Sequence, residues 1–155
     1  MEAESRVVEK VDVARLFNES RSRLVGLAAA ILMDRITAEE VVQDAFEGLQ
    51  RHVQDVDNPL GYLRRSVVNR SVSVVRRRRL TARHPMPKLE PASLPEIDET
   101  WIAVGRLPPR QRAVVVLRFW EDQSVDAIAH TLGWPAGSVK SALHRALRQL
   151  KKELS

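Results

Sequence analysis

The stretch LGWPAGSVKSALHRALRQLKK, residues 132–152, joins a glycine–tryptophan–proline start to a long run of helical periodicity. At 100° per residue, Val139, Leu143, Ala146 and Leu150 fall within one narrow arc. The other side has small polar residues in its first turns and cations further along. These exposed-side residues are Gly137, Ser138, Lys140, Ser141, His144, Arg145 and Arg148. The pattern predicts an amphipathic helix with one face packed and the other available to a partner.

The residues just before this helix predict a second, shorter one. SVDAIAHTL, residues 124–132, has Ser124 as an N-cap and apolar residues at steps of three and four. Gly133 can take the left-handed conformation that ends a helix, and Pro135 favours the start of the next. Two helices joined by such a turn form a helix-turn-helix, whose second helix reads DNA in the major groove. A solvated basic face is the alternative for an isolated helix, but the preceding helix favours DNA reading.

The rest of the chain also shows helical rather than strand periodicity. A first helix is predicted from about Val11 to Met33, and a second from Thr37, where TAEE is typical of a capping box between Thr37 and Glu40. A third starts at Pro59 with Asn58 as N-cap. The residues expected to be buried include Leu60, Leu63 and Val67 in the third helix, and Val114, Leu117 and Phe119 in the helix after LPPR.

Helical periodicity fails between Leu80 and Pro95. The segment TARHPMPKLEPASLP contains four prolines and no apolar stripe, which is typical of a linker. The sequence therefore predicts an all-α fold of two small helical domains, at residues 11–80 and 97–154, joined by a proline-rich linker at residues 81–96.

Composition narrows the function classes. The net charge of +5 favours a polyanionic partner, and the absence of cysteine excludes disulfides and thiolate metal sites. The histidines show no metal-ligand spacing, and the adjacent carboxylates Glu39 and Glu40 do not face each other, so no cofactor or acid–base catalysis is expected. The polar start and the short apolar run at residues 24–33 favour a cytoplasmic protein over an exported or membrane-spanning one.

Three stretches together resemble one family. LPPRQRAVVVLRFWEDQSVDAIAHTLGWPAGSVKSALHRALRQL, residues 107–150, resembles region 4 of bacterial sigma factors of the extracytoplasmic-function (ECF) type, in the sigma-70 family. RITAEEVVQDAFEGL, residues 35–49, resembles region 2.2, and NPLGYLRRSVVNRSVSVVRRRR, residues 58–79, resembles regions 2.3 to 2.4. The short NPLGYLRR form is similar to sigma factors common in actinobacteria. The resemblance covers nearly the whole chain.

The resemblance implies a protein that is not an enzyme. It would bind core RNA polymerase, through the beta and beta-prime subunits, and direct it to promoters. The region 4 helix would read the −35 element as duplex, and region 2 would hold the −10 element as single strand. An anti-sigma factor is a common further partner in this family.

The resemblance also assigns residues. Core polymerase binding falls on Glu40, Gln43, Asp44 and Glu47, for which a solvated acidic face is the alternative. Contact with the −10 element falls on Arg65, Asn69, Ser73 and Arg76, on the arginine run 76–79, and on the loop 52–58 with Asn58. Asn58 also fits a helix cap, and Tyr62 a packed aromatic.

A second class stays open from the sequence. A stand-alone helix-turn-helix regulator, with the first half as a signalling or dimerisation module, would share the motif at residues 124–152. Such a regulator should bind a duplex operator tightly by itself, whereas a sigma subunit needs core polymerase.

Overall fold

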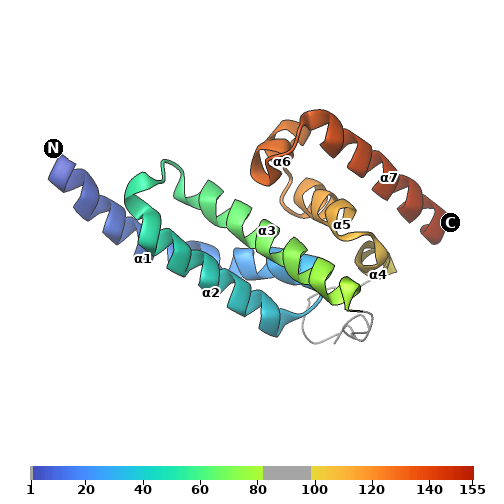
Figure 1. Cartoon of the computed structure of the whole chain (residues 1–155), viewed down its shortest axis with the longest axis horizontal. Helices are drawn as coiled ribbons and strands as arrows, with labels where there is room; N and C mark the ends of the chain where they lie inside the picture. The colour runs from blue at the N-terminus through green and yellow to red at the C-terminus, as the bar shows by residue number, and fades with distance from the viewer. Residues whose placement is uncertain (1, 82–98) are drawn as a thin grey trace.

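The computed structural model describes the backbone of residues 2–81 and 99–155, and side chains from Val13 onwards in those ranges. Every regular element in these ranges is helical, which confirms the all-α prediction (Figure 1). The predicted linker lies almost entirely outside the described residues. The helices are α1 (Glu2–Leu32), α2 (Arg35–His52), α3 (Pro59–Leu80), α4 (Glu99–Arg106), α5 (Pro109–Val115), α6 (Val125–Leu132) and α7 (Ala136–Leu154). A 3₁₀ turn, η1 (Val53–Asp55), follows α2, and a π-helical turn, η2 (Val116–Trp120), continues α5.

Helices α1, α2 and α3 pack on one another as an N-terminal bundle (Figure 1). The predicted stripes of α1 and α2 are mostly buried, and in α3 Leu63 and Val67 are fully enclosed. Leu60 is expected to be buried but is 36% exposed, because the first turn of α3 borders an open cavity rather than the core. Helix α1 begins well before Val11, since its start is rich in residues that favour a helix without needing a buried face.

The capping-box prediction for α2 is wrong in register. The N-cap is Asp34, whose carboxylate accepts from the Thr37 backbone N–H at 3.3 Å and from the Thr37 hydroxyl. Arg78, at the far end of α3, donates to the same carboxylate at 3.1 Å. Burial opposes ionisation of Asp34, yet the Thr37 and Arg78 contacts together lower its pKa below the ordinary 3.8. A partner 44 residues away thus favours Asp34 over Thr37 as the cap.

The Asp34→Ala variant is expected to lose about 2 kcal/mol of unfolding free energy, half from the cap and half from the Arg78 contact. Asp34→Asn keeps a capping oxygen but not the charge, so it should lose about half as much. Because the folded pKa is lowered, the charge contribution is complete at neutral pH and is lost as pH falls through the folded value. Urea unfolding followed by circular dichroism measures the free energy of unfolding of the wild type and both variants. Equal losses of stability in Asp34→Ala and Asp34→Asn would contradict a capping role.

The C-terminal half contains α4 to α7. Pro109 occupies the first turn of α5 as predicted, and Val114 and Leu117 are fully buried. Phe119 is also expected in the core but is 60% exposed. The π-helical turn η2 has more residues per turn than an α-helix, so it rotates Phe119 out of the buried stripe.

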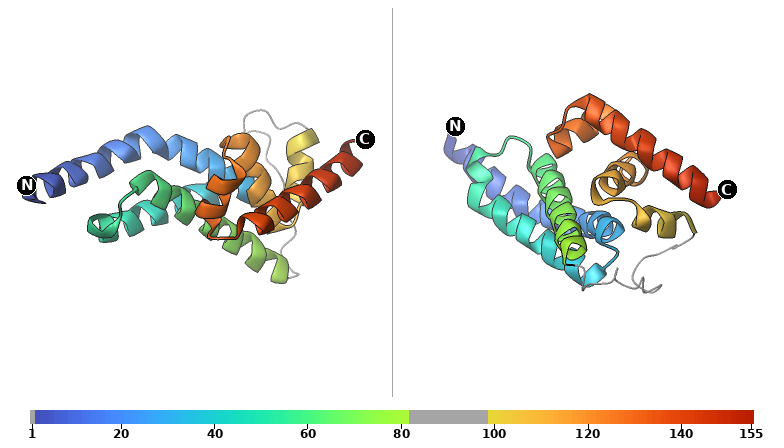
Figure 2. Two further views of the ribbon diagram at one scale, coloured as in Figure 1. Left: turned by 90° about the horizontal axis from the view of Figure 1, so that it is seen from above. Right: turned by 45° about the vertical axis from the view of Figure 1, so that its right-hand side comes forward.

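The two halves share one hydrophobic core. Helix α3 contacts α5 and α6, while α1 contacts α4, α5 and η2 (Figures 1 and 2). Buried residues of both halves form a single cluster, running from the α1–α3 bundle into α4, α5 and α7. The predicted domain boundaries remain predictions; in this arrangement the halves are packed together rather than held apart.

Arg112 is the most enclosed charged residue of the described chain, at 1% exposed. It lies on α5, and its guanidinium donates to the carbonyl oxygens of Ile31 at 2.7 Å, of Gly105 and of Leu107 at 3.2 Å. Ile31 and Gly105 belong to the last turns of α1 and α4, whose carbonyls have no partner within their helices. Burial, with a smaller effect of the Arg79 charge, lowers the pKa of Arg112 to about 10, so it stays charged at neutral pH.

Candidate nucleic-acid interface

The helix-turn-helix has the geometry expected from the sequence. Helix α6 is capped by Ser124, whose hydroxyl accepts from the Ala127 backbone N–H at 3.1 Å. Gly133 ends it in the left-handed region, at φ 70°. Pro135 precedes the first residue of α7. Trp134 lies between them under the guanidinium of Arg110, 4.0 Å from the ring centre, so it braces the turn. These contacts set the angle at which α7 leaves the core.

Helix α7 divides into a buried and a solvent-facing side. Val139 and Ala146 are fully buried, Leu150 nearly so, and Leu143 is partly buried against the core. The predicted recognition face is exposed along its length. Its members are Gly137, Ser138, Lys140, Ser141, His144, Arg145 and Arg148. None of these side chains has a hydrogen-bond or ion-pair partner in residues 13–81 and 99–155, so the face is free to contact a ligand.

Gly137 lies in the first turn of α7, where a recognition helix approaches DNA most closely. A Cβ added there would meet no atom of the chain within 4 Å. The fold itself therefore does not require glycine at this position. The lack of a side chain at Gly137 leaves open space above the helix backbone.

A second candidate surface follows the outer side of α3. Arg65, Asn69, Ser73 and Arg76 recur at steps of three and four and are all exposed, as predicted. Asn58 caps α3, accepting from the Gly61 backbone N–H at 3.0 Å, so the capping role is confirmed. Tyr62 is packed against the core.

Two arginines of the 76–79 run already have partners within the chain. Arg78 donates to Asp34 and, at 3.0 Å, to the Thr37 hydroxyl. Arg79 donates to the Leu107 carbonyl at 3.0 Å and so links α3 to the C-terminal half. Arg76 and Arg77 are exposed and without such bonds in the described ranges. The arginine run therefore combines structural and candidate binding residues, which the sequence alone does not separate.

An acidic surface lies on α2. Glu40, Gln43, Asp44 and Glu47 are all exposed, and the Gln43 amide donates to Glu47 at 3.4 Å. Asp44 is 4.0 Å from Arg70 of α3, a distant and solvent-exposed pair of small energy. Next to this surface is a cavity of about 590 Å³ between α1 and α2, lined in part by Phe17, Phe46, Gln43 and Glu47. The acidic surface is therefore bordered by an apolar hollow.

The loop predicted to capture a base contains the turn η1. Val53 and Val56 pack against the core. With Val13, Leu16 and residues 57–60 they line a cavity of about 340 Å³. No aromatic side chain is among the lining residues. The loop thus offers a hollow but no stacking platform.

Residues 13–81 and 99–155 contain no cluster of three or more His, Asp or Glu side chains placed to hold a metal. Over the same part of the chain, no helix combines the length and the apolar character that crossing a membrane requires.

An all-helical chain with a helix-turn-helix, a cationic recognition helix and a separate acidic surface belongs to the class of DNA-binding transcription proteins. The family comparison specifies it further. The sigma-70 region 2 profile matches residues 16–81, and the sigma-70 region 4 profile matches residues 102–150. The chain belongs to the sigma-70 family of RNA polymerase sigma factors, in its ECF group.

Similar proteins are found among actinobacterial sigma factors. The chain is 32% identical over 161 residues to the RNA polymerase sigma-E factor of Streptomyces antibioticus, covering 98% of this chain and 88% of that one. It is 34% identical over 140 residues to the sigma-E factor of Streptomyces coelicolor, covering 84% and 79%. The fold is similar to the sigma factor RpoE from Bartonella quintana, solved in complex with the anti-sigma factor NepR. The TM-score is 0.71 at 20% identity, over 92% of this chain and 96% of that chain.

The family decides between the two classes left open by the sequence. The protein is a sigma factor for transcription initiation rather than a stand-alone regulator, and sigma factors are not enzymes. As a sigma factor, it acts with core RNA polymerase on promoter DNA.

Proposed function

We propose that two exposed surfaces, one on α7 and one on α3, recognise different promoter elements. The partnerless cationic face of α7 reads the −35 element in duplex DNA, through Lys140, Ser141, His144 and Arg148, with Gly137, Ser138 and Arg145 beside them. The observation that carries this proposal is that the whole face is exposed and unbonded within the described residues, while Val139 and Ala146 on its reverse are fully buried. Serine, lysine, histidine and arginine side chains can donate to base edges and phosphates.

The outer face of α3 is the proposed contact for the −10 element. Arg65 and Arg76 supply phosphate attraction, and Asn69 and Ser73 supply hydrogen bonds to single-stranded bases. The hollow beside Val53 and Val56 is the proposed place for an unstacked base.

The acidic surface of α2 is the proposed contact for core polymerase, on its beta and beta-prime subunits. Glu40, Gln43, Asp44 and Glu47 are exposed on a chain whose net charge is +5, so an acidic surface here suits a basic groove on a partner. The place of action we propose is the cytoplasm, where the polymerase transcribes. An anti-sigma protein is a further proposed partner, suggested by the complex of the similar Bartonella sigma factor.

The proposed function is tested by reconstitution. The purified chain should co-purify with core RNA polymerase and support run-off transcription from a subset of a promoter library. Tight binding to one duplex by the chain alone, with no transcript in the presence of core polymerase, would contradict it. The selected promoters would also identify the sequences that α7 and α3 prefer.

The Asp44→Asn variant is expected to bind core polymerase about fivefold more weakly, or about 1 kcal/mol, since it removes one charge from the proposed interface. Its stability should be unchanged, because the 4.0 Å pair with Arg70 is solvent-exposed. Asp126→Asn, with the same charge change on exposed α6, is the matched control and should bind core as the wild type does. Fluorescence anisotropy of the labelled chain measures both; equal weakening would contradict the assignment to α2.

A further inference from the structure

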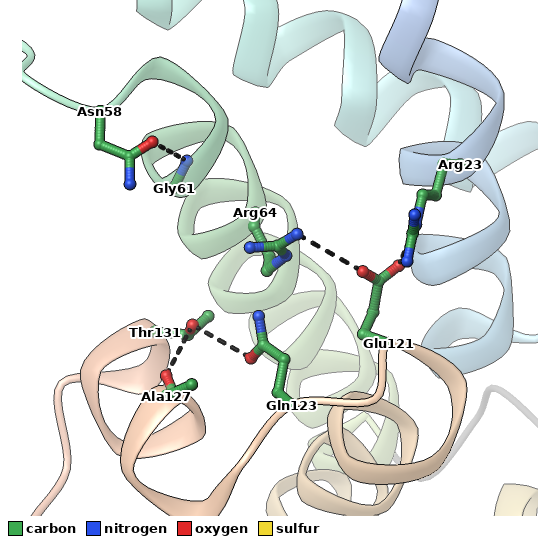
Figure 3. Close-up of polar contacts among 8 residues, drawn as sticks. All are labelled: Arg23, Asn58, Gly61, Arg64, Glu121, Gln123, Ala127 and Thr131. Carbon is green, nitrogen blue, oxygen red and sulfur yellow. Dashed lines mark hydrogen bonds and ion pairs between the residues drawn. The ribbon is translucent and has the colours of Figure 1, made fainter.

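Arginines at the junction of the two halves differ in whether the chain supplies a negative partner. Arg23 of α1 and Arg64 of α3 both pair with the Glu121 carboxylate, at 3.4 and 3.6 Å (Figure 3). That carboxylate follows η2, and its side chain is only 2% exposed. Arg76 of α3 and Arg145 of α7 have no ion-pair partner in the described ranges. The fold therefore neutralises one group of junction arginines and leaves another without a negative charge.

A cavity of about 450 Å³ lies beside the second group, between α3, the start of α5 and α7. Its volume falls within the range of about 300–1,000 Å³ that is typical of small-molecule sites. Its charged lining residues are Arg76, Arg110 and Arg145, and none of the described lining residues is acidic. Its apolar lining residues are Pro108, Pro109, Trp134 and Ala142. The cavity thus combines three guanidinium groups with an apolar wall.

The three guanidinium groups favour a ligand with several negative charges. Exposed like charges repel one another modestly in water, and an anion between them reverses the sign of that interaction. Guanidinium groups also bind phosphate oxygens through pairs of parallel N–H donors. Ser138, a further lining residue, belongs to the first turn of α7, where the helix dipole favours negative charge. Phosphate groups therefore match this side of the cavity.

The other side of the cavity suits a flat, partly apolar group better than a bare phosphate chain. The Trp134 indole and the two prolines supply apolar surface that a phosphate chain would not cover. Gln111 also lines the cavity, and its buried Oε1 accepts no hydrogen bond in the described chain. The amide can therefore turn towards a ligand hydroxyl or amino group without breaking a bond at that oxygen. A ribose or a nucleobase supplies such a donor.

The walls of the cavity are in place without a ligand. Helix α5 contacts both α3 and α7, and Glu121 links its own half to Arg64 of α3. Arg79 of α3 donates to the Leu107 carbonyl at 3.0 Å, directly before the lining residue Pro108. A preformed cavity loses little conformational freedom when it binds a ligand.

We propose that this cavity is a binding site for a nucleoside polyphosphate. Its phosphates lie between Arg76, Arg110 and Arg145, and its nucleoside contacts Trp134 and Gln111. Arg76 and Arg145 also belong to the proposed DNA surfaces, so a bound nucleotide competes with promoter DNA for them. This competition rests on the proposed function of α3 and α7, whereas nucleotide binding itself does not.

Isothermal titration calorimetry of the full chain tests the site with ATP, GTP, inorganic tripolyphosphate and adenosine at one ionic strength. At least one of the two nucleotides should bind, with one molecule per chain. Tripolyphosphate should bind about tenfold more weakly than that nucleotide, since it lacks the nucleoside contacts, and adenosine more weakly still, since it lacks the phosphates. Tripolyphosphate binding as tightly as both nucleotides, or no binding of either nucleotide, would overturn the proposal.

Arg110→Met removes one cavity guanidinium and should weaken nucleotide binding about tenfold. Arg110 belongs to neither proposed DNA surface. Arg76→Met should have a similar effect from the α3 side, which covers the case in which Arg110→Met disturbs Trp134. Arg51→Met is the matched control, because it removes the same charge from an exposed position on α2 that does not line the cavity. Equal weakening by Arg51→Met would show general attraction of polyanions to a basic chain and would overturn the site.

Competition separates this site from the proposed function. The nucleotide at about ten times its Kd should weaken binding of a −35 duplex to the wild type about tenfold, and should weaken it far less for Arg110→Met. Fluorescence anisotropy of the labelled duplex measures both. Nucleotide binding with no effect on duplex affinity would support the cavity site and would instead contradict the placing of Arg145 in the DNA surface.

Discussion

The free energy of unfolding of the Arg112→Met variant should be about 3 kcal/mol lower than that of the wild type, the largest stability loss we expect from a single side chain. Methionine has a similar length and can fill the space, so the loss comes mainly from the carbonyl oxygens of Ile31, Gly105 and Leu107. Each accepts from the guanidinium, and hydrogen bonds to a charged group contribute about 1.5–3 kcal/mol apiece. The cost of burying the charge, which also lowers the Arg112 pKa, offsets part of this sum.

Arg110→Met is the matched control for this measurement. Arg110 is exposed and stacks on Trp134, so its replacement should cost less than about 1 kcal/mol. The free energy of unfolding of Arg112→Lys should be close to that of Arg112→Met, because one ammonium group cannot reach carbonyls in three directions. Urea unfolding followed by circular dichroism compares the four proteins. Stability of Arg112→Met within about 0.5 kcal/mol of the wild type would show that desolvation cancels the three bonds.

Local patterns account for the elements that the sequence predicts well. Asn58, Ser124 and Gly133 act on backbone groups within four residues, so their neighbours in sequence suffice to identify them. The division of α7 into buried Val139, Ala146 and Leu150 and an exposed cationic side follows from helical periodicity in the same way. These features define the candidate recognition face, which is why it could be predicted.

The features that sequence reasoning misses depend on partners far along the chain. Arg112 interrupts an apolar run and is buried because Ile31, 81 residues away, offers a carbonyl. Glu121 stands in an exposed-looking stretch, FWEDQ, but its partners are 98 and 57 residues away (121 − 23 and 121 − 64). Asp34 rather than Thr37 is the α2 cap, because Arg78 also donates to the Asp34 carboxylate. Phe119 is exposed because of a π-helical turn, which no local pattern indicates.

The sequence predicts two helical domains joined by a linker but not whether they touch, and contacts between residues distant in sequence explain why the two halves pack together. Periodicity identifies which face of each helix is apolar but not which other helix covers it. Here α3 presents apolar residues both to α1 and α2 and to α5 and α6, so one core serves both halves. The shared core of the two halves therefore becomes apparent only in the three-dimensional arrangement.

The double variant Lys140→Ala/Arg148→Ala should lower promoter-dependent run-off transcription at least about 30-fold, the largest functional loss we expect. Each cation that contacts a base edge or phosphate contributes about 1–3 kcal/mol, so two together account for roughly 2–6 kcal/mol. Stability should be unaffected, because both side chains are exposed and have no bonded partner in the described residues. Binding to core polymerase should also persist, since the proposed contact lies on α2.

Arg35→Ala/Arg51→Ala removes the same charge from exposed positions of the N-terminal bundle and should transcribe nearly as the wild type does. The Arg35 pair with Glu39, at 3.5 Å, is solvent-exposed, so its loss should cost little stability.

Salt titration of binding to the isolated −35 duplex separates the two kinds of contact made by α7. Loss of a phosphate contact lowers the slope of log affinity against log salt by about one, whereas loss of a base contact leaves the slope and relaxes sequence preference. Equal transcription from both double variants, or an equal loss of core binding by Lys140→Ala/Arg148→Ala, would show that α7 does not serve as a separate DNA-reading surface.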